Sequence, residues 1–331
     1  MTIKTKKVTA LGLCSGGLDS ILAGVVLREQ GIDARWISFE TPFFSADKAR
    51  KAARMTGIPL TVRNITSEYL KMLRDPACKF GKNMNPCMDC HALMFRIAGG
   101  MMREQGADFL FSGEVMGQRP MSQTKNSLRY VEKHSGFDGY IVRPLSMQKL
   151  PETIPEKQGL LDRESLYGIS GRSRRDQIAL AEKFGIRDYP APAGGCLLTD
   201  KIFSIRLRDL FRHQEQYTEE ELHLLKFGRH FRIDSQSKII VGRDKADNEG
   251  IFRHFSPEQA VLLKTPAVPG PAVLLSGSRE HLPLAAGICV GYSRVSDDLE
   301  TEVQVRDANG KYSIRVKGIP PQEIRPYLIQ S

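Results

Sequence analysis

A short run of small and polar residues near the start of the chain, Ser15-Gly16-Gly17-Leu18-Asp19-Ser20, has the residue types that bind a phosphate chain. It follows an apolar run over residues 8–14 that predicts a buried strand, and from Leu18 onward apolar residues recur with helical spacing. Two adjacent glycines let the backbone turn several N–H groups toward one point, and the start of a helix adds partial positive charge. The common nucleotide-binding loop differs, because there a lysine follows the glycines. We predict that residues 15–20 all contact a nucleotide.

Cysteines form the second set of residues that could do chemistry. Cys87 and Cys90 make a Cys-x-x-Cys pair at the start of a helix predicted to run to residue 105, and the helix N-terminus lowers thiol pKa values. Cys196 lies in a loop rich in proline and glycine. Three such thiols could hold a metal ion or exchange sulfur as a redox group. Cys14 and Cys289 lie in strand-like patterns and are predicted to be core.

The elements that position these residues alternate between strand and helix. Strands are predicted over residues 34–40, 60–64, 108–112 and 140–145, with helices between them. This alternation predicts an α/β fold with a doubly wound parallel sheet, whose ligands bind at the carboxyl ends of the strands. The residues that follow the 108–112 strand are therefore candidates for contacts to the nucleotide: Gly113, Glu114 and Gln118.

The composition shifts near residue 200, where a second, smaller α+β domain is predicted. We place the domains at 1–204 and 205–331. Strand patterns in the second domain cover residues 231–234, 238–242, 272–275, 287–292, 302–307 and 313–316, and Asn309-Gly310 predicts a hairpin turn. Basic residues interleave with aromatic residues over 226–256, a pattern that suits binding to a nucleic-acid backbone. Four basic residues of this domain are predicted to bind RNA: Arg229, Arg232, Lys238 and Arg243.

The charge of the chain favours a polyanionic partner. Its 331 residues carry a formal net charge of +10, for which RNA is the first candidate. Arg172, Arg174 and Arg175 stand at the start of a predicted helix, where cations oppose the helix dipole unless an anion binds them. We expect these three to contact RNA as well. No run is long and apolar enough to span a membrane and no signal peptide is evident, so we expect a cytoplasmic protein without a membrane partner; whether it forms a homodimer stays open.

The loop over residues 15–20, the segment Ser112-Gly113-Glu114-Val115-Met116-Gly117-Gln118 and the late Gly194-Gly195-Cys196 together resemble the PP-loop ATP pyrophosphatases that act as tRNA 4-thiouridine synthetases. The Asn85-Pro86-Cys87-Met88-Asp89-Cys90 segment is similar to a segment of the tRNA 2-thiouridylases. The chain from about residue 205 resembles the NFACT RNA-binding domain around residues 238–244. No RNA-binding extension precedes the loop and no rhodanese domain is appended, so RNA capture is expected from the second domain and residues 172–175.

This resemblance implies ATP as cofactor, bound with its pyrophosphate on the loop and its adenine near Phe39. Asp19 would help to hold Mg²⁺. Iron–sulfur-dependent tRNA thiolases hold a 4Fe–4S cluster with three cysteines, so Cys87, Cys90 and Cys196 are the implied ligands. Zinc, or no metal with a persulfide on Cys196, are the alternatives. We assign catalysis to Asp19 and these three cysteines.

The implied reaction adenylates a uridine carbonyl of tRNA and replaces its oxygen with sulfur from sulfide or a persulfide carrier. Formation of 4-thiouridine is the first interpretation, and formation of 2-thiouridine is the alternative. A protein of another class, a nucleotide-dependent RNA-binding adaptor without catalysis, would retain the loop and the basic domain.

Overall fold

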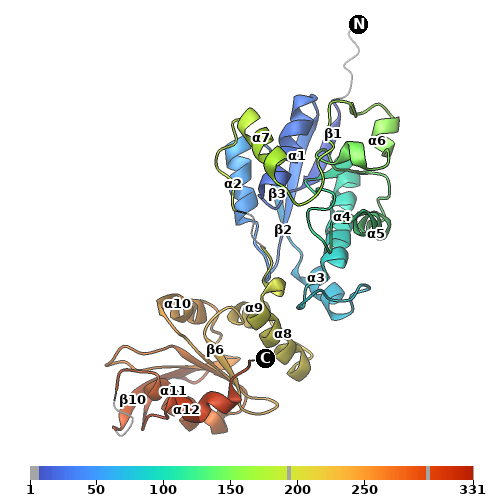
Figure 1. The fold of residues 1–331 in the computed structure, drawn as a ribbon. Helices are drawn as coiled ribbons and strands as arrows, with labels where there is room; N and C mark the ends of the chain where they lie inside the picture. The colour runs from blue at the N-terminus through green and yellow to red at the C-terminus, as the bar shows by residue number, and fades with distance from the viewer. Residues whose placement is uncertain (1–6, 192–194, 296–298, 331) are drawn as a thin grey trace. The chain divides into compact units, whose positions relative to one another are not determined.

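The computed structural model describes residues 7–191, 195–295 and 299–330, which fold into two compact units, Met1–Thr199 and Asp200–Ser331 (Figure 1). The predicted domain boundary between residues 204 and 205 stays a prediction. The two compact units are defined by their internal contacts, which do not show where one function ends and another begins. Among the described residues, no helix combines the length and the apolar character needed to cross a membrane.

The first unit is built on a five-stranded sheet in the order β3-β2-β1-β4-β5, with every strand parallel to its neighbours. Its strands are β1 (Thr9–Leu13), β2 (Asp33–Glu40), β3 (Leu60–Asn64), β4 (Phe109–Ser112) and β5 (Ile141–Val142). The predicted doubly wound α/β sheet is therefore confirmed. The last strand is shorter than the predicted 140–145, because Pro144 has no N–H to continue the ladder.

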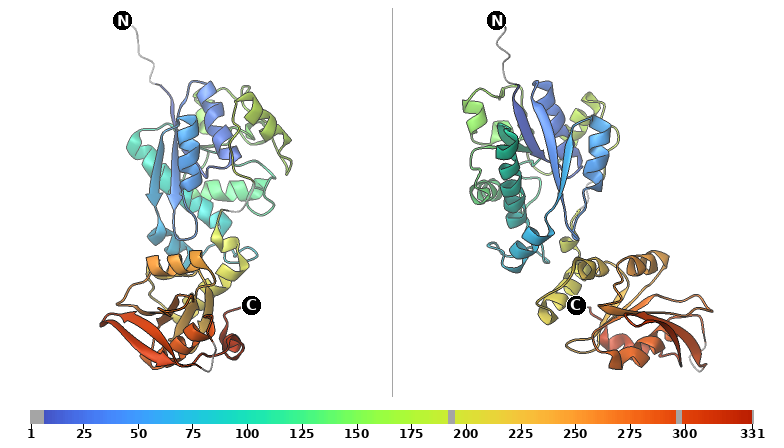
Figure 2. Two further views of the ribbon diagram at one scale, coloured as in Figure 1. Left: turned by 90° about the vertical axis from the view of Figure 1, so that its left-hand side faces the viewer. Right: turned by 180° about the vertical axis from the view of Figure 1, so that it is seen from behind.

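Helices cover both faces of this sheet. They are α1 (Leu18–Glu29), α2 (Asp47–Thr56), α3 (Thr66–Arg74), α4 (Cys87–Gln105), α5 (Lys125–Ser135), α6 (Ile154–Lys157) and α7 (Arg175–Lys183). Figures 1 and 2 show α1, α2 and α7 on one face, with α4 and α5 on the other. The core between sheet and helices includes Trp36, which is fully buried, together with Leu22 of α1 and Phe111 of β4.

The direction of winding reverses between β1 and β4. From β1 the chain moves outward to β2 and β3, then returns past β1 to β4 and β5. Such a switch point opens a crevice at the carboxyl ends of the two central strands. Leu13 of β1 pairs with Ser112 of β4, so the loop after β1 and the segment after β4 leave the sheet side by side.

The second unit has a six-stranded antiparallel sheet in the order β11-β10-β8-β9-β7-β6. Its strands are β6 (Arg229–Arg232), β7 (Lys238–Val241), β8 (Ala260–Lys264), β9 (Val273–Ser276), β10 (Thr301–Asp307) and β11 (Gly310–Val316). Its helices are α8 (Lys201–His213), α9 (Glu219–Leu224), α10 (Lys245–Arg253), α11 (Leu282–Gly291) and α12 (Pro321–Ile324). Ile239 packs in the cluster that contains α11, whereas Ile240 packs with Ile251 of α10, so both faces are covered. The predicted hairpin joins β10 to β11, and Gly310 has a φ of 115°.

The strand predicted over residues 287–292 is wrong, since these residues lie at the end of helix α11. A continuous apolar run does not distinguish a buried strand from a buried helix. Small residues decide the case: the carbonyl oxygen of Ile319 lies 1.9 Å from where a Cβ of Gly291 would stand, and Gly287 meets the Ile319 side chain in the same way. Strand β8 was not predicted, because its apolar run over residues 261–263 is short and lacks the alternation typical of a strand.

Candidate active site

The predicted phosphate-binding loop is a tight turn between β1 and α1. Gly16 has a φ of 72°, and a Cβ there would lie 2.2 Å from the backbone carbonyl carbon of Lys48 in α2, so the turn requires glycine. Ser20 Oγ donates to the carbonyl of Gly17 at 2.8 Å and fixes the first turn of α1. The first helical bond comes from Ile21, so the three preceding N–H groups have no acceptor within the helix. The loop thus presents free backbone donors at a helix N-terminus, which suits an anion.

Gly113, which directly follows β4, packs against this loop. A Cβ on Gly113 would lie 2.3 Å from the backbone carbonyl carbon of Asp19 and 2.4 Å from the backbone nitrogen of Ser20. The segment after β4 therefore approaches the start of α1 more closely than any side chain would permit.

We expect Gly113→Ala to displace the start of α1 and to lower kcat/KM for ATP by about 10²-fold, the cost of misplacing a bound substrate by about 1 Å. Pyrophosphate release and calorimetric titration with ATP measure the effect. The matched control is Gly100→Ala in α4, where no atom lies within 4 Å of the new methyl group. This control should keep ATP affinity and gain about 0.5–1 kcal/mol of stability. Equal ATP affinity in both variants would contradict the close approach.

Only one of the two carboxylate oxygens of Asp19 has a hydrogen-bond partner among the described residues. Its Oδ2 accepts a hydrogen bond from Gln118 Nε2 at 2.9 Å, whereas its buried Oδ1 has no hydrogen-bond partner among the described residues. Burial raises the pKa of this carboxyl, and the hydrogen bond from Gln118 and the charges of Arg174 and Arg119 oppose that rise. An unpartnered carboxylate oxygen beside a phosphate-binding turn is a fitting ligand for Mg²⁺.

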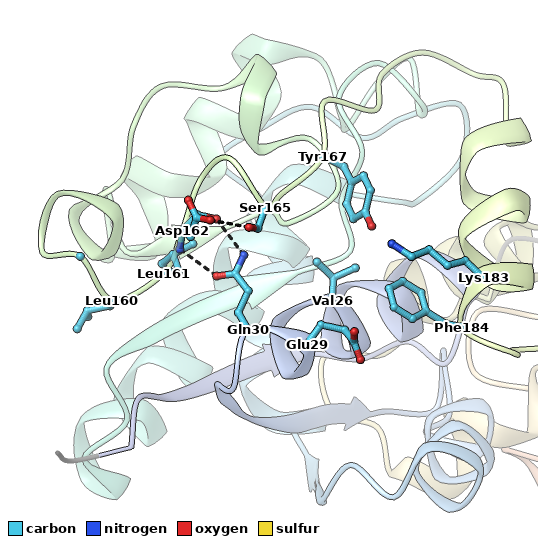
Figure 3. A pocket seen from close by; sticks show the side chains of 11 residues that line it. Val26, Glu29, Gln30, Leu160, Leu161, Asp162, Ser165, Tyr167, Lys183 and Phe184 are labelled. Atoms are coloured by element: carbon cyan, nitrogen blue, oxygen red, sulfur yellow. Dashed lines mark hydrogen bonds between the residues drawn. The ribbon is translucent and has the colours of Figure 1, made fainter. Parts of the chain in front are cut away.

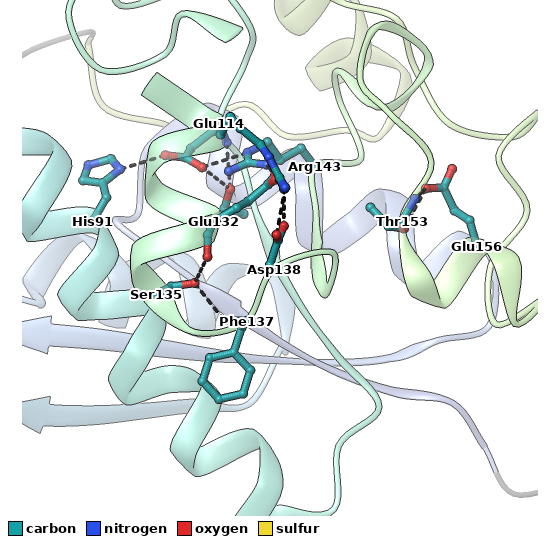
Figure 4. A network of polar contacts seen from close by, with 11 residues as sticks. His91, Glu114, Glu132, Ser135, Phe137, Asp138, Arg143, Thr153 and Glu156 are labelled. Atoms are coloured by element: carbon teal, nitrogen blue, oxygen red, sulfur yellow. Dashed lines mark hydrogen bonds and ion pairs between the residues drawn. The ribbon is translucent and has the colours of Figure 1, made fainter. Parts of the chain in front are cut away.

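Glu114 lies in a buried ionic network instead of facing a ligand (Figure 4). Its Oε2 accepts from Arg143 Nε at 2.9 Å and from Ser112 Oγ at 3.1 Å, and its Oε1 lies 2.7 Å from His91 Nδ1. Arg143 is itself buried and is also paired with Glu132. This network joins the segment after β4 to the first turns of α4.

Two residues predicted to contact ATP have little free surface. Glu114 is 6% exposed and both of its carboxylate oxygens are engaged, and Phe39 is 5% exposed within β2. Gln118 is bonded to Asp19. Gln118 therefore lies at the phosphate-binding loop, whereas Glu114 contacts α4 and helps to position it.

Cys196 reaches the Cys-x-x-Cys pair through a series of contacts. The N–H of Leu197 donates to the carbonyl of Phe43 at 2.9 Å, and the Phe43 ring lies 5.6 Å from the ring of Tyr69 in α3. The Tyr69 hydroxyl in turn donates a hydrogen bond to the thiol of Cys90. The charges of Cys90 and Cys196 act on each other, so the two thiols lie within electrostatic range.

The irregular segment before α4 closes over the same place. Asn83 Nδ2 donates to the carbonyl of Thr199 at 2.7 Å, and Asn85 Nδ2 donates to Cys87 Sγ at 3.3 Å. Asp89, inside the Cys-x-x-Cys pair, accepts from the backbone N–H of Cys78 at 2.7 Å. These bonds tie the residues around both cysteine segments into one loop cluster.

The cysteines and the phosphate-binding loop share one edge of the sheet. Helix α4 ends at Gln105 and turns through Gly106, which has a φ of 65°, into β4. Since α4 therefore runs opposite to β4, its first residue Cys87 lies at the carboxyl edge, where the loop after β1 also lies. The contact of His91 with Glu114 spans this edge directly.

The three thiols supply the ligand type of an iron–sulfur cluster. Burial raises the pKa of Cys90, and the charges of Cys196 and Cys87 raise it further; burial raises the pKa of Cys196 to about 11. A bound cation would relieve this electrostatic repulsion between thiolates. As they stand, the described residues contain no group of three His, Cys, Asp or Glu side chains arranged to hold a metal ion. The donor chemistry of the three thiols is the type that an iron–sulfur cluster requires.

An open cavity of about 620 Å³ lies elsewhere in the first unit, between the second half of α1, residues 159–167 and the end of α7 (Figure 3). Glu29 and Lys183 contribute opposite charges to its lining, and Gln30 bonds to the backbone of Asp162. None of the predicted site residues lines it. The cavity is separate from the carboxyl edge of the sheet, because it lies along the C-terminal half of α1.

Two family models match the chain. Residues 5–154 match the model described as thiamine biosynthesis protein (ThiI), and residues 228–328 match the model described as NFACT protein RNA binding domain. The first unit thus contains a region similar to the ThiI model, and the second unit contains a region similar to the NFACT RNA-binding domain. The resemblance predicted from the loop, the segment after β4 and the second domain is thereby confirmed.

Curated relatives of the ThiI domain carry tRNA-modifying names. The tRNA-specific 2-thiouridylase MnmA of Geobacter metallireducens is 30% identical over 135 residues, which are 34% of this chain and 36% of that protein. The MnmA of Geotalea uraniireducens is 22% identical over 209 residues, which are 56% and 52%. A probable tRNA sulfurtransferase of Ureaplasma parvum is 30% identical over 168 residues, which are 49% and 41%. The chain spans about half or less of the length of these relatives.

The basic residues predicted to bind RNA differ in their surroundings. In the NFACT domain, Arg232 pairs with Asp209 at 2.5 Å, and burial lowers the pKa of Lys238 to about 8. Arg229 lies over the ring of Tyr292, 5.4 Å from its centroid. The fourth residue, Arg243, pairs with Asp247 and keeps 46% of its side chain exposed. Arg229 and Arg243 therefore have the most freedom to meet a phosphate.

In the first unit, Arg172 and Arg175 are exposed, as an RNA-binding role requires. Arg174 is half-buried, and its charge acts on Asp19.

The sequence did not reveal the roles of Tyr69 and Arg143, because neither residue lies near its contact residues in the sequence. The sequence shows an Arg-Pro pair directly after β5, but no pattern in it predicts a buried ion pair.

Proposed function

We propose that the chain is an ATP-dependent tRNA sulfurtransferase that adenylates a uridine carbonyl and replaces its oxygen with sulfur, forming 4-thiouridine. One observation carries the proposal: the phosphate-binding loop and the segments bearing three cysteines meet at the same edge of the sheet. An AMP-forming loop beside cysteine-bearing segments suits a reaction of activation followed by sulfur transfer. We further propose that residues 1–204 perform the chemistry and that residues 205–331 bind RNA.

The first half-reaction needs positioning and charge stabilisation. The uridine O4 attacks the α-phosphorus of ATP, and the bond to the leaving pyrophosphate breaks. The free backbone N–H groups at the start of α1 bind the pyrophosphate, and Asp19 Oδ1 offers a ligand to Mg²⁺. Gln118 fixes the orientation of that carboxylate through Oδ2.

The second half-reaction forms the C–S bond. Sulfide attacks C4 of the adenylated base, the C–O bond breaks, and AMP leaves with the former carbonyl oxygen. Cys87, Cys90 and Cys196 would hold a 4Fe–4S cluster, which supplies an open iron for sulfide. Without a cluster, a persulfide on Cys196 is cleaved by the thiol of Cys90 or Cys87, which releases sulfide and leaves a disulfide between the two cysteines. Tyr69 orients Cys90 in both versions.

Several features support tRNA as the substrate. The NFACT RNA-binding domain matches over residues 228–328, and the chain has a net charge of +10. In the second unit the rings of His223 and His254 stack at 4.5 Å, with Phe227 stacked on His254 at 6.1 Å. Stacked rings beside Lys226, whose Nζ lies 2.7 Å from His223 Nδ1, suit an unpaired base and its phosphate.

The test is a reaction of the full chain with tRNA, ATP, Mg²⁺ and sulfide without oxygen. We expect AMP and thiolated uridine in equal amounts, measured by chromatography and by mass spectrometry of digested tRNA. Asp19→Asn should lower AMP formation by about 10²–10³-fold, because a preorganised charge at the reacting phosphates is lost. AMP without a thiolated nucleoside would contradict the proposal, and tRNA binding without AMP would identify an adaptor. Mass spectrometry against synthetic standards separates 4-thiouridine from 2-thiouridine.

Metal analysis of protein purified without oxygen separates the sulfur routes. A cluster predicts brown protein that loses its iron in Cys87→Ala, Cys90→Ala and Cys196→Ala. The control Cys289→Ala should keep the iron, because this thiol is buried in α11 of the second unit. Stoichiometric zinc would assign a zinc site. Metal-free protein that forms thiouridine with a persulfide donor, and not with sulfide, would assign the persulfide route, because sulfide alone cannot convert a thiol to a persulfide.

A further inference from the structure

Arg174 lies within electrostatic range of the phosphate-binding loop, although it stands far from that loop in the sequence. It immediately precedes α7, and its charge and that of Arg119 both act on Asp19. Neither arginine forms an ion pair within the described part of the chain. Two guanidinium groups thus lie within electrostatic range of the Asp19 carboxylate without forming an ion pair with it.

Backbone bonds hold the Arg174 segment in this place. Ser170 forms a parallel bridge with Met116, and the N–H of Gly171 donates to the carbonyl of Met116 at 2.7 Å. Gly117 has a φ of 78° and would place a Cβ 3.3 Å from the nitrogen of Gly171. The chain before α7 is therefore tied to the segment that follows β4.

Two side-chain amides, one of them fully buried, continue the connection to the loop. Gln177, in the first turn of α7, is fully buried, and its Nε2 donates to Gln118 Oε1 at 3.4 Å. Gln118 Nε2 in turn donates to Asp19 Oδ2. Because the two amides share this series of bonds, the start of α7 and the carboxylate of Asp19 keep a fixed relation.

Three polar atoms in this group are buried and have no hydrogen-bond partner among the described residues: Asp19 Oδ1, Arg174 Nε and Gln177 Oε1. Leaving such an atom unsatisfied costs about 1–3 kcal/mol. The unpaired Arg174 N–H would be satisfied by an anionic oxygen, and the unpaired oxygens of Asp19 and Gln177 would be satisfied by a cation or a donor. These atoms therefore fit a ligand that carries both anionic oxygens and a cation. A pyrophosphate group with its Mg²⁺ has that composition.

We propose that Arg174 binds the β- and γ-phosphates of ATP and remains on the pyrophosphate as it leaves, while the Gln177–Gln118 pair directs Asp19 toward Mg²⁺. This inference rests on the proposed function and assigns Arg174 to the nucleotide in place of RNA. A guanidinium matches phosphate oxygens with paired N–H donors, and its charge stabilises the leaving group as negative charge builds there.

The test measures binding of inorganic pyrophosphate with Mg²⁺, and of ATP, to the full chain by calorimetry. Arg174→Ala should abolish detectable pyrophosphate binding and lower kcat/KM for ATP by about 10²–10³-fold, the effect of removing one preorganised donor. Arg174→Lys should recover part of the affinity, since it restores charge without the paired donors. The affinity for tRNA, measured without ATP, should stay unchanged.

Arg187→Ala is the matched control, because Arg187 is an exposed arginine of the same unit that the site does not use. It should bind pyrophosphate as the wild type does. Fluorescence of Trp36, the only tryptophan, verifies that each variant folds. Unchanged pyrophosphate affinity with weakened tRNA binding in Arg174→Ala would overturn the inference and return this residue to RNA. A wild-type chain that binds neither ATP nor pyrophosphate would overturn the proposed function itself.

Discussion

Cys196→Ser is expected to abolish sulfur transfer and to leave adenylation of the tRNA intact. A serine hydroxyl carries no persulfide and is a poor ligand for iron, so the loss of thiolated uridine should be about 10³-fold or more, as for the loss of a nucleophile. Adenylation should persist, because Cys196 lies among Phe43, Tyr69 and Cys90 and makes none of the contacts that hold Asp19. This variant should therefore form AMP without forming thiouridine.

The measurement counts AMP by chromatography and thiouridine by mass spectrometry in one reaction. Cys289→Ser is the control: its thiol is buried in the second unit and donates to the carbonyl of Pro271 at 3.8 Å. That variant should form both products at the wild-type rate. Thiouridine formed at the wild-type rate by Cys196→Ser would show that sulfur travels by another route.

Local patterns made the phosphate-binding loop predictable. An apolar strand, two glycines and a helical repeat occupy consecutive residues, so the turn and the free N–H groups follow from spacing alone. The alternation of elements also placed Gly113 and the loop at the same edge of a parallel sheet, because parallel strands bring their carboxyl ends to one edge. The strand order that makes β1 and β4 neighbours comes from the structure.

Long-range partners were not predictable in the same way. The sequence assigned Arg174 to RNA since three basic residues at a helix start look alike, and burial is what separates Arg174 from Arg172 and Arg175. In the second domain, Lys238 lies in a strand whose two faces are both covered, so its side chain is buried in the protein and not exposed to solvent. Charge patterns show that cations are present, and only packing shows which of them reach solvent.

The second large effect is expected for Arg143→Met, which should lower the free energy of unfolding of the first unit by about 3–5 kcal/mol. Arg143 is 1% exposed and is the cation for two carboxylates, Glu114 and Glu132. Methionine fills much of the volume but leaves Glu114 buried, with the His91 ring and the Ser112 hydroxyl as its remaining side-chain contacts. Urea unfolding followed by the fluorescence of Trp36 reports this unit alone, because Trp36 is the only tryptophan and lies in β2.

Arg129→Met is the control that shares a partner with Arg143. Arg129 also pairs with Glu132, yet its side chain is 49% exposed, so its loss should cost less than about 1 kcal/mol. Adding Glu114→Gln to Arg143→Met should recover part of the loss, because a neutral amide needs no cation. Equal costs for the two arginine variants would show that burial of the network does not matter.

The pH dependence gives an independent test of the same network. Burial alone would raise the pKa of Glu114, but the charge of Arg143 and the contact with His91 lower it to about 2 from an ordinary value of 4.5. A carboxyl whose pKa falls on folding adds stability above its unfolded pKa and loses that contribution as the pH falls through its folded value. The stability gap between wild type and Arg143→Met should therefore be full at neutral pH and narrow between pH 4.5 and 2. A gap that stayed constant over this window would mean that the ion pair with Glu114 does not carry the effect.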